Sequence, residues 1–161
     1  IMAFRSRIYF PELLFELGIS AYKEERFLIK LESQNQEVDY IPKMTTINSC
    51  GFFFSFPVPP DDVLCAMKIA ALLSRAKGRD FYDLLWFMQQ RVQPLEEKLA
   101  KDGNQSYTIQ SAMKMLKEKV ETIRLSDLAE DLLPLFEQRS FIEAWLEGFK
   151  ENFFEYLKNY Q

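Results

Sequence analysis

Residues 67–87 read MKIAALLSRAKGRDFYDLLWF, an apolar segment in which four cations are followed by two aspartates. No acidic residue occurs between Val63 and Arg79, although Lys68, Arg75 and Lys77 fall in that interval. Charge is costly to keep beside buried apolar side chains unless it has a partner. Concentrated positive charge next to a core therefore indicates a site for phosphate or for a cluster of carboxylates.

The same segment predicts two consecutive helices. Asp61 or Asp62 is suited to cap a first helix that runs to about residue 77, with Gly78 at its end. Asp80 then opens a second helix over residues 81–92, because an aspartate is favoured at a helix start. The residues of this second helix that should face the core are Phe81, Leu84, Leu85, Phe87 and Met88.

The remainder of the chain is also predicted to be helical. A short helix should begin at Pro94 and end near residue 101, followed by helices over about 108–123, 126–136 and 140–160. Ser126 and Ser140 are the expected N-caps, and Glu143 completes a capping-box pattern with Ser140. The aromatic residues Phe141, Trp145, Phe149 and Phe153 recur every four positions, which is typical of a packing surface and could also serve to bind a partner.

The first sixty residues show strand patterns instead. Residues 26–32 alternate Phe27, Ile29 and Leu31 with other side chains, which predicts a strand with one buried face. A second strand is expected over residues 51–58, whose four phenylalanines should belong to the core or to a helix-packing surface. Pro11 is suited to the first turn of a short helix that should end at Gly18. Residues 34–49 are polar and are predicted to form a loop, with or without an extra strand near Tyr40.

Composition sets broad limits on function. With 161 residues, 48% of them hydrophobic, the chain suits one domain or a small domain with an appendage. The net charge of -4 argues against a surface coated with nucleic-acid-binding charge, although a local basic stripe is compatible with it. The chain has no histidine and two cysteines, Cys50 and Cys65, which excludes the usual zinc frameworks and any histidine-dependent triad. Both thiols are expected to be reduced and buried.

No membrane span or signal peptide is recognisable, which predicts a cytoplasmic protein.

The string K-x-x-A-L-x-x-R-x-x-x-R-D-x-x-D-L, from Lys68 to Leu84, resembles the nucleotidyltransferase-like AbiEii/AbiGii toxin family of bacterial abortive-infection and toxin–antitoxin systems. The resemblance covers about residues 27–88. It implies an α+β fold, in which residues 1–60 are a remnant of a polymerase-beta-like nucleotidyltransferase core with a few strands. Residues 61–161 are then a predominantly helical domain that carries the motif.

The resemblance also implies a chemistry. Enzymes of this family use Mg²⁺ and an NTP, and acidic residues on the sheet bind the metal. By resemblance Glu32 is one of these ligands. The family's glycine-rich turn and Asp-x-Asp motif are missing, because no two of the chain's aspartates are two positions apart. The chain is therefore expected to be a carboxy-terminal part of such a protein and to be inactive in nucleotide transfer by itself. An RNA acceptor such as tRNA and an antitoxin encoded beside the toxin are the implied partners.

Five residues of the motif carry the expected site. Lys68, with Arg75 on the same helical face and Arg79 beyond it, is predicted to bind the nucleotide phosphates. Asp83 and Asp80 lie three apart on the next helix, where either could orient a cation, position the acceptor hydroxyl or act as a base, with Asp83 preferred.

Structural explanations compete with these roles. Asp80 could be only a helix cap, Lys68 could extend from a half-buried helix to solvent, and Arg79 with Asp83 could be an ordinary i,i+4 pair. The alternative function is a non-catalytic helical interaction domain, in which the charged face makes salt bridges and the last aromatic helix binds a partner.

Overall fold

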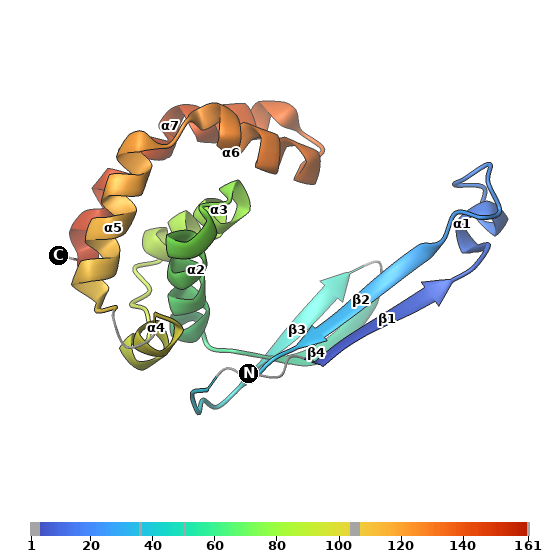
Figure 1. Ribbon diagram of the computed structural model, residues 1–161, viewed down its shortest axis with the longest axis horizontal. Coiled ribbons are helices and arrows are strands. Elements are labelled where there is room, and N and C mark those ends of the chain that lie inside the picture. Colours follow the sequence, from blue (N-terminus) through green and yellow to red (C-terminus); the bar gives the residue numbers. More distant parts are fainter. Residues whose placement is uncertain (1–3, 36, 50, 104–106, 161) are drawn as a thin grey trace. The chain divides into compact units, whose positions relative to one another are not determined.

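The computed structural model describes residues 4–35, 37–49, 51–103 and 107–160. It divides into two compact units, Ile1–Glu37 and Val38–Gln161, which are described separately here (Figure 1). Strands occupy the amino-terminal part of the chain and helices follow Pro60. The predicted α+β fold class is therefore confirmed.

The first unit is an antiparallel hairpin of β1 (Phe4–Phe10) and β2 (Phe27–Ser33), in which Ile8 lies opposite Ile29. Between the strands lies a one-turn helix, α1 (Leu13–Glu16), followed by Gly18 with a φ of 70°. The helix after Pro11 and its glycine stop were predicted, and so was β2 within one residue at each end. The sequence reading did not assign β1.

The predicted buried face of β2 is wrong. The side chains expected inside, Phe27, Ile29 and Leu31, are 41%, 39% and 47% exposed. A two-stranded hairpin buries little on either face unless another layer packs on it, and the described part of this unit contains only the hairpin and α1. Period-two alternation thus located the strand correctly without indicating what covers it.

The second unit begins with another antiparallel hairpin, β3 (Lys43–Ser49) and β4 (Phe52–Val58), joined by a turn that includes Gly51 at a φ of 81°. The optional extra strand near Tyr40 corresponds to β3, which begins three residues later. The assignment of the β4 phenylalanines to the core is wrong. Phe52, Phe53, Phe54 and Phe56 are 71%, 74%, 48% and 53% exposed, because this hairpin also has only two strands.

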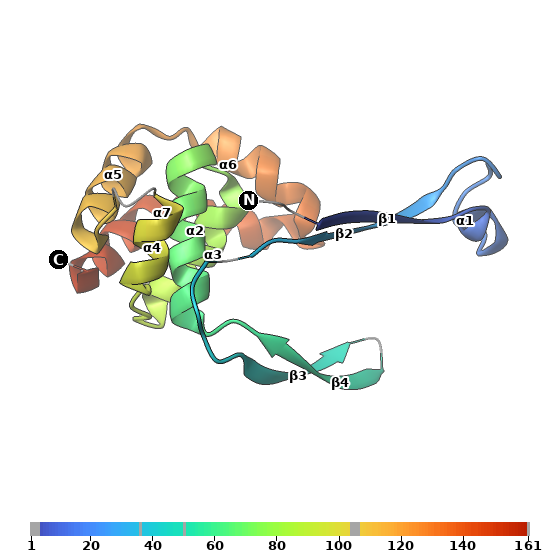
Figure 2. The same cartoon turned by 60° about the horizontal axis from the view of Figure 1, so that its bottom comes forward.

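Helices make up the rest of the unit. Their bounds are α2 (Asp61–Arg75), α3 (Gly78–Gln89), α4 (Glu96–Asp102), α5 (Ile109–Thr122), α6 (Leu125–Leu132), η1 (Leu133–Leu135), α7 (Arg139–Leu157) and η2 (Lys158–Tyr160). Helix α2 packs against α3, α4 and α5, and α3 also packs against α6 and α7 (Figure 2). The two helices that carry the motif are therefore central to the helical core.

All the fully enclosed apolar side chains among the described residues come from Val63 onward. The five core residues predicted for the second helix are all buried. Of the spaced aromatics of α7, Phe149 and Phe153 are 0% and 1% exposed, whereas Phe141 is 49% exposed. The periodicity of α7 therefore identified a core face that includes Phe149 and Phe153 but not Phe141.

Several predicted helix boundaries need correction. Gly78 does not end α2, because Ala76 does so in the left-handed conformation, and Gly78 instead begins α3. The N-cap positions of α6 and α7 are Arg124 and Gln138, and neither Ser126 nor Ser140 caps a helix. The Ser140–Glu143 capping box is therefore also wrong. Both serines lie inside the first turn, since each helix starts one residue earlier than its serine.

Cys65 is buried and free, as predicted, and Cys50 lies outside the described residues. Burial, together with the negative charge of Asp62, raises the pKa of the Cys65 thiol to about 12. Within the described residues, no helix has the length and apolar character needed to cross a membrane.

Candidate functional site

Lys68 lies between two aspartates. It projects from the middle of α2, and its Nζ is 3.3 Å from Asp80 Oδ1 and 2.6 Å from Asp83 Oδ2, both on α3. The two aspartates reach one ammonium because residues three apart are neighbours on a helix surface. The expectation that Asp80 and Asp83 point to one side of their helix and can orient Lys68 agrees with this geometry.

Asp80 also binds Arg75 through two hydrogen bonds. Arg75 Nε donates to Asp80 Oδ2 at 2.8 Å, and Arg75 Nη2 donates to Oδ1 at 3.1 Å. The Asp80 side chain is 1% exposed, whereas those of Arg75 and Lys68 are 50% and 31% exposed. A buried carboxylate thus binds two cations whose side chains are partly exposed.

Two opposing effects act on the Asp80 carboxyl. Burial raises its pKa, but the hydrogen bond from Arg75 and the charge of Lys68 lower it, and the net pKa is below the ordinary value. Asp80 is therefore ionised at neutral pH. Asp80 lies in the first turn of α3, but its carboxylate also binds Lys68 and Arg75, so it is more than a cap. Its contacts hold the side chains of Lys68 and Arg75, and its role in a reaction stays a prediction.

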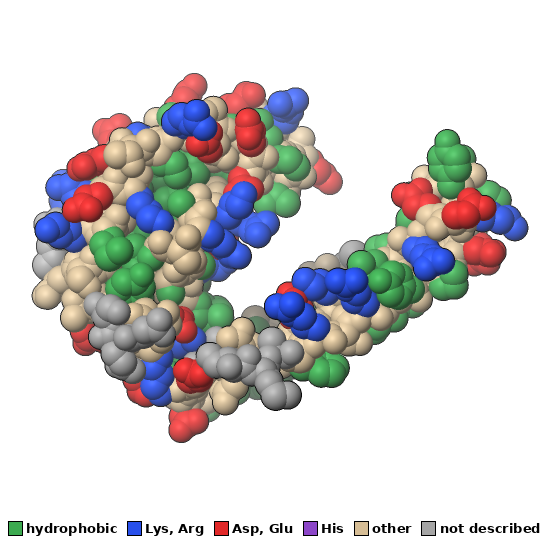
Figure 3. All heavy atoms as spheres, viewed as in Figure 1, with side chains coloured by type: hydrophobic (Ala, Val, Ile, Leu, Met, Phe, Trp, Pro, Cys, Tyr) green, Lys and Arg blue, Asp and Glu red, His purple; other side chains and the backbone are tan. Residues whose placement is uncertain are grey.

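Asp83 and Arg79 lie on the more open side of α3. The Asp83 side chain is 43% exposed and contacts only Lys68 among the ion pairs of the described residues. Arg79 is exposed, and within the described chain it has no ion pair or hydrogen bond, so the structural Arg79–Asp83 pair is not formed. Figure 3 shows Lys and Arg side chains gathered around α2 and α3, with acidic side chains beside them.

The junction between α2 and α3 is held by side chains from later helices. Lys119 of α5 donates to the carbonyl oxygens of Leu72 and Leu73, at 2.8 and 2.7 Å, near the end of α2. Asp131 of α6 accepts from the Gly78 backbone N–H at 2.8 Å, at the start of α3. Free backbone groups at helix ends are thereby paired, and the crossing of the two motif helices is fixed.

Neither Lys119 nor Asp131 was predicted from the sequence. Each lies more than forty positions from the backbone groups that it binds, and no local pattern links such distant residues. The sequence contains one indication of this junction, which is the glycine at position 78 inside the motif. A Cβ at that position would lie 2.8 Å from the Leu128 carbonyl oxygen, so the close approach of α3 to α6 requires glycine there.

Glu32, the predicted metal ligand, belongs to β2 of the first unit. It is ion-paired with Arg5 at 3.1 Å and with Lys30 at 2.9 Å, and these cations, led by the hydrogen bond from Lys30, lower the pKa of its carboxyl. No group of three or more acidic or cysteine side chains in the described ranges is arranged to hold a metal ion. The described residues therefore do not form a complete magnesium site, and the role of Glu32 stays a prediction.

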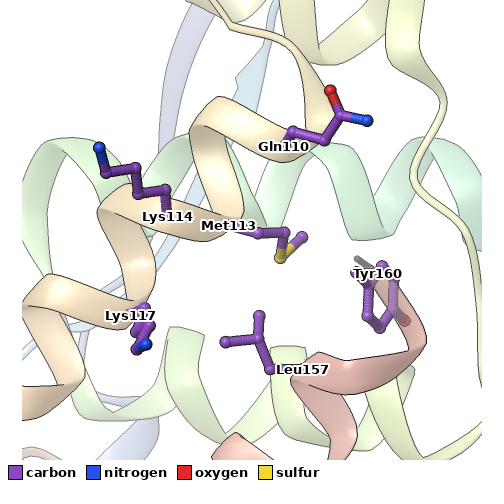
Figure 4. Close-up of a pocket in the computed structure, with 6 residues that line it drawn as sticks. All are labelled: Gln110, Met113, Lys114, Lys117, Leu157 and Tyr160. Carbon is purple, nitrogen blue, oxygen red and sulfur yellow. The ribbon is translucent and has the colours of Figure 1, made fainter.

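A separate pocket of about 280 Å³ opens between α5 and the end of the chain. Met113 of α5 and Leu157 of α7 extend into it, with Tyr160 on one side and Lys117 on the other (Figure 4). Tyr160 donates its hydroxyl to the Val92 carbonyl oxygen at 2.6 Å. None of the carboxylates of the Lys68 site lines this pocket, which therefore does not extend that site.

The charged cluster on α2 and α3 combines cations that could receive phosphate with an accessible carboxylate that could receive a proton. A comparison with protein-family models matches residues 15–160 to the family described as "Nucleotidyl transferase AbiEii toxin, Type IV TA system". Comparisons with curated proteins and with solved structures gave no match. The family match extends beyond the motif and includes the helices that hold Lys119 and Asp131. The chain belongs to the AbiEii family of nucleotidyl transferase toxins.

Proposed function

We propose that this chain supplies the phosphate-binding and proton-accepting residues of an enzyme that transfers a nucleotide from an NTP to a hydroxyl group of an acceptor. The observation that carries the proposal is Lys68, held between buried Asp80 and accessible Asp83. Membership of a nucleotidyl transferase toxin family gives the reaction class. RNA, such as tRNA, is the acceptor class that we propose.

Lys68 is the residue that we assign to the triphosphate, with Arg75 beside it. The carboxylate of Asp80 keeps Lys68 and Arg75 in place from the buried side, so their outer N–H groups can donate to phosphate oxygens. Arg79, which the motif also assigned to the nucleotide phosphates, lies beyond them on α3 and has no carboxylate partner among the described residues, so we assign it to a phosphate of the acceptor instead. An anionic triphosphate thus meets donors that are already oriented, which reduces the cost of binding.

Asp83 is the proposed proton acceptor. The oxygen of the acceptor hydroxyl forms a bond to the α-phosphorus, the bond from that phosphorus to the bridging oxygen breaks, and pyrophosphate leaves. The hydroxyl proton passes to Asp83 and then to solvent. Asp80 is less suited to this step, because its carboxylate is 1% exposed and committed to two cations.

Magnesium is proposed as the cofactor from the family resemblance, with Glu32 as one ligand. Because no acidic cluster among the described residues completes a metal site, the phosphate and proton roles above are assigned without it. The family description also implies a cognate antitoxin, and we propose a role in defence against phage in the cytoplasm.

The test is transfer of label from an α-³²P-labelled NTP to RNA by the full protein. Asp83→Asn and Lys68→Met should each lower the transfer rate at least about a hundredfold, the scale expected for a general base or an electrostatic donor. Their melting temperatures should change little, because both side chains are partly exposed. Lys158→Met, which removes another ion-paired lysine on η2, is the control and should leave the rate unchanged.

Unaltered transfer in Asp83→Asn and Lys68→Met would contradict these roles. A large loss of folding in both variants would assign the cluster to structure instead, and would favour a helical interaction domain over an enzyme.

A further inference from the structure

The face of α3 beside Asp83 continues into a groove shared with α7. The groove has a volume of about 250 Å³, and its lining includes Tyr82, Trp86, Gln89, Trp145, Asn152 and Tyr156. This is smaller than the roughly 300–1,000 Å³ typical of pockets for drug-sized ligands. Its size therefore suits one flat ring system or a short side chain.

The groove is rich in aromatic surface. Trp86 is 50% exposed and its ring lies 5.1 Å from that of Phe87, while the rings of Tyr82 and Trp145, which also line the groove, lie 5.4 Å apart. An exposed indole supported by other rings offers a stacking face for a planar ligand, and nucleic-acid bases stack on aromatic side chains regardless of sequence. The composition thus favours a base over an aliphatic ligand.

Two carboxamides complete the lining. Gln89 and Asn152 are exposed, and their side-chain amides make no hydrogen bond with any residue that the structure describes. Carboxamides provide a donor and an acceptor in one plane, which is the arrangement that reads the edge of a base. Gly148, one turn before Asn152, leaves room for this amide, since a Cβ there would lie 3.0 Å from Asn152 Nδ2.

Arg79 connects the groove to the charged site. It precedes Tyr82, Asp83 and Trp86 by three, four and seven positions, so all four share one side of α3. Arg79 is exposed and has no ion pair or hydrogen bond with the rest of the described chain. A nucleotide whose base lies in the groove can therefore place its phosphate on a free cation.

We propose that the groove binds the acceptor nucleotide of a single-stranded RNA, with its base on Trp86, its edge at Gln89 and Asn152, and its phosphate on Arg79. The acceptor hydroxyl then lies next to Asp83, one helical turn before Trp86. This inference rests on the proposed function, because it assigns the acceptor side of the same reaction.

Binding of a fluorescein-labelled oligoadenylate to the full chain, followed by fluorescence anisotropy over a range of salt concentrations, tests the proposal. Trp86→Ala should weaken binding about 5- to 150-fold, as expected for the loss of one stacked base, and Trp86→Phe should restore most of it. Arg79→Ala should also reduce the slope of log affinity against log salt by about 0.7, the value for one phosphate contact on a single strand. Trp86→Ala should leave that slope unchanged.

Met115→Ala and Arg124→Ala are the controls, since they remove an exposed apolar side chain and an exposed arginine elsewhere among the helices. Wild-type affinity in Trp86→Ala, or equal binding of duplex and single-stranded RNA, would overturn the proposal. Loss of ATP binding in Trp86→Ala, with oligoadenylate binding intact, would assign the groove to the NTP base and would also overturn it. Binding of inorganic triphosphate at Lys68, measured separately, reports on the proposed function alone.

Discussion

At the residue scale, the site depends on one buried carboxylate. Asp80 accepts hydrogen bonds from Lys68 and Arg75 while its own side chain is almost fully enclosed. A buried charge is tolerated only when partners satisfy it, and two cations do so here. Sequence spacing correctly suggested that Asp80 and Asp83 lie on one side of α3, where both contact Lys68. It could not show that Asp80 is the buried member of the pair.

Asp80→Asn should lower the free energy of unfolding at pH 7 by about 2 kcal/mol, because the two half-exposed cations lose a charged partner but can be hydrated. The folded-state pKa of Asp80 is lowered, so its stabilising contribution is present above the unfolded pKa of about 3.9 and is lost as pH falls further. In urea titrations between pH 7 and pH 2.5, the free energy of unfolding should therefore decline less steeply below about pH 4 in Asp80→Asn than in the wild-type chain.

Asp127→Asn is the matched control for that measurement. Asp127 is 46% exposed and pairs with Arg124 on the surface, so its loss should cost less than about 1 kcal/mol. Equal effects of the two substitutions at every pH would show that burial of Asp80 has no energetic consequence.

At the element scale, the crossing of α2 and α3 brings Lys68 to its aspartates. Local patterns predicted both helices, since apolar side chains recur at helical spacing and aspartates stand near the first turns. The boundary between the helices was predicted wrongly because glycine is usually a helix stop. Its position is decided by tertiary contacts with Leu128 and Asp131, which single-sequence reasoning does not reveal.

Gly78→Ala should destabilise the chain by about 1–3 kcal/mol, the usual cost of forcing an extra methyl group into a closely packed contact. Gly148→Ala is the contrasting control, because its new methyl group meets only the movable amide of Asn152 and a helical alanine is favoured by up to about 1 kcal/mol. Thermal unfolding followed by circular dichroism measures both. If the two substitutions shift the melting temperature in the same direction, the contact between α3 and α6 does not set the junction.

At the scale of the whole molecule, burial is distributed unevenly. The helices enclose the core, whereas both hairpins expose phenylalanine side chains and the first hairpin also exposes isoleucine and leucine. Alternating hydrophobicity in residues 26–32 and the phenylalanines of β4 predicted strands correctly and burial wrongly. A strand pattern indicates that a face is apolar, but only the neighbouring elements decide whether that face is covered.

The prediction of the site was limited in the same way, because local patterns do not show which distant elements come together. Lys68, Arg75, Asp80 and Asp83 come together because they lie on two consecutive helices, within reach of a sequence argument. Glu32 lies in the other compact unit, so its relation to them depends on contacts that no local pattern encodes. The groove beside Trp86 also escaped prediction, since it joins α3 to residues more than fifty positions later.

The most direct test of the central claim, that the Lys68 cluster is a phosphate site and not a network of structural salt bridges, is isothermal titration of the full chain with inorganic triphosphate. The account predicts saturable binding that weakens at least about tenfold in Lys68→Met, a loss of about 1.4 kcal/mol, and is unchanged in Lys158→Met. Equal affinity in the wild-type chain and Lys68→Met, with both proteins folded, would contradict the claim.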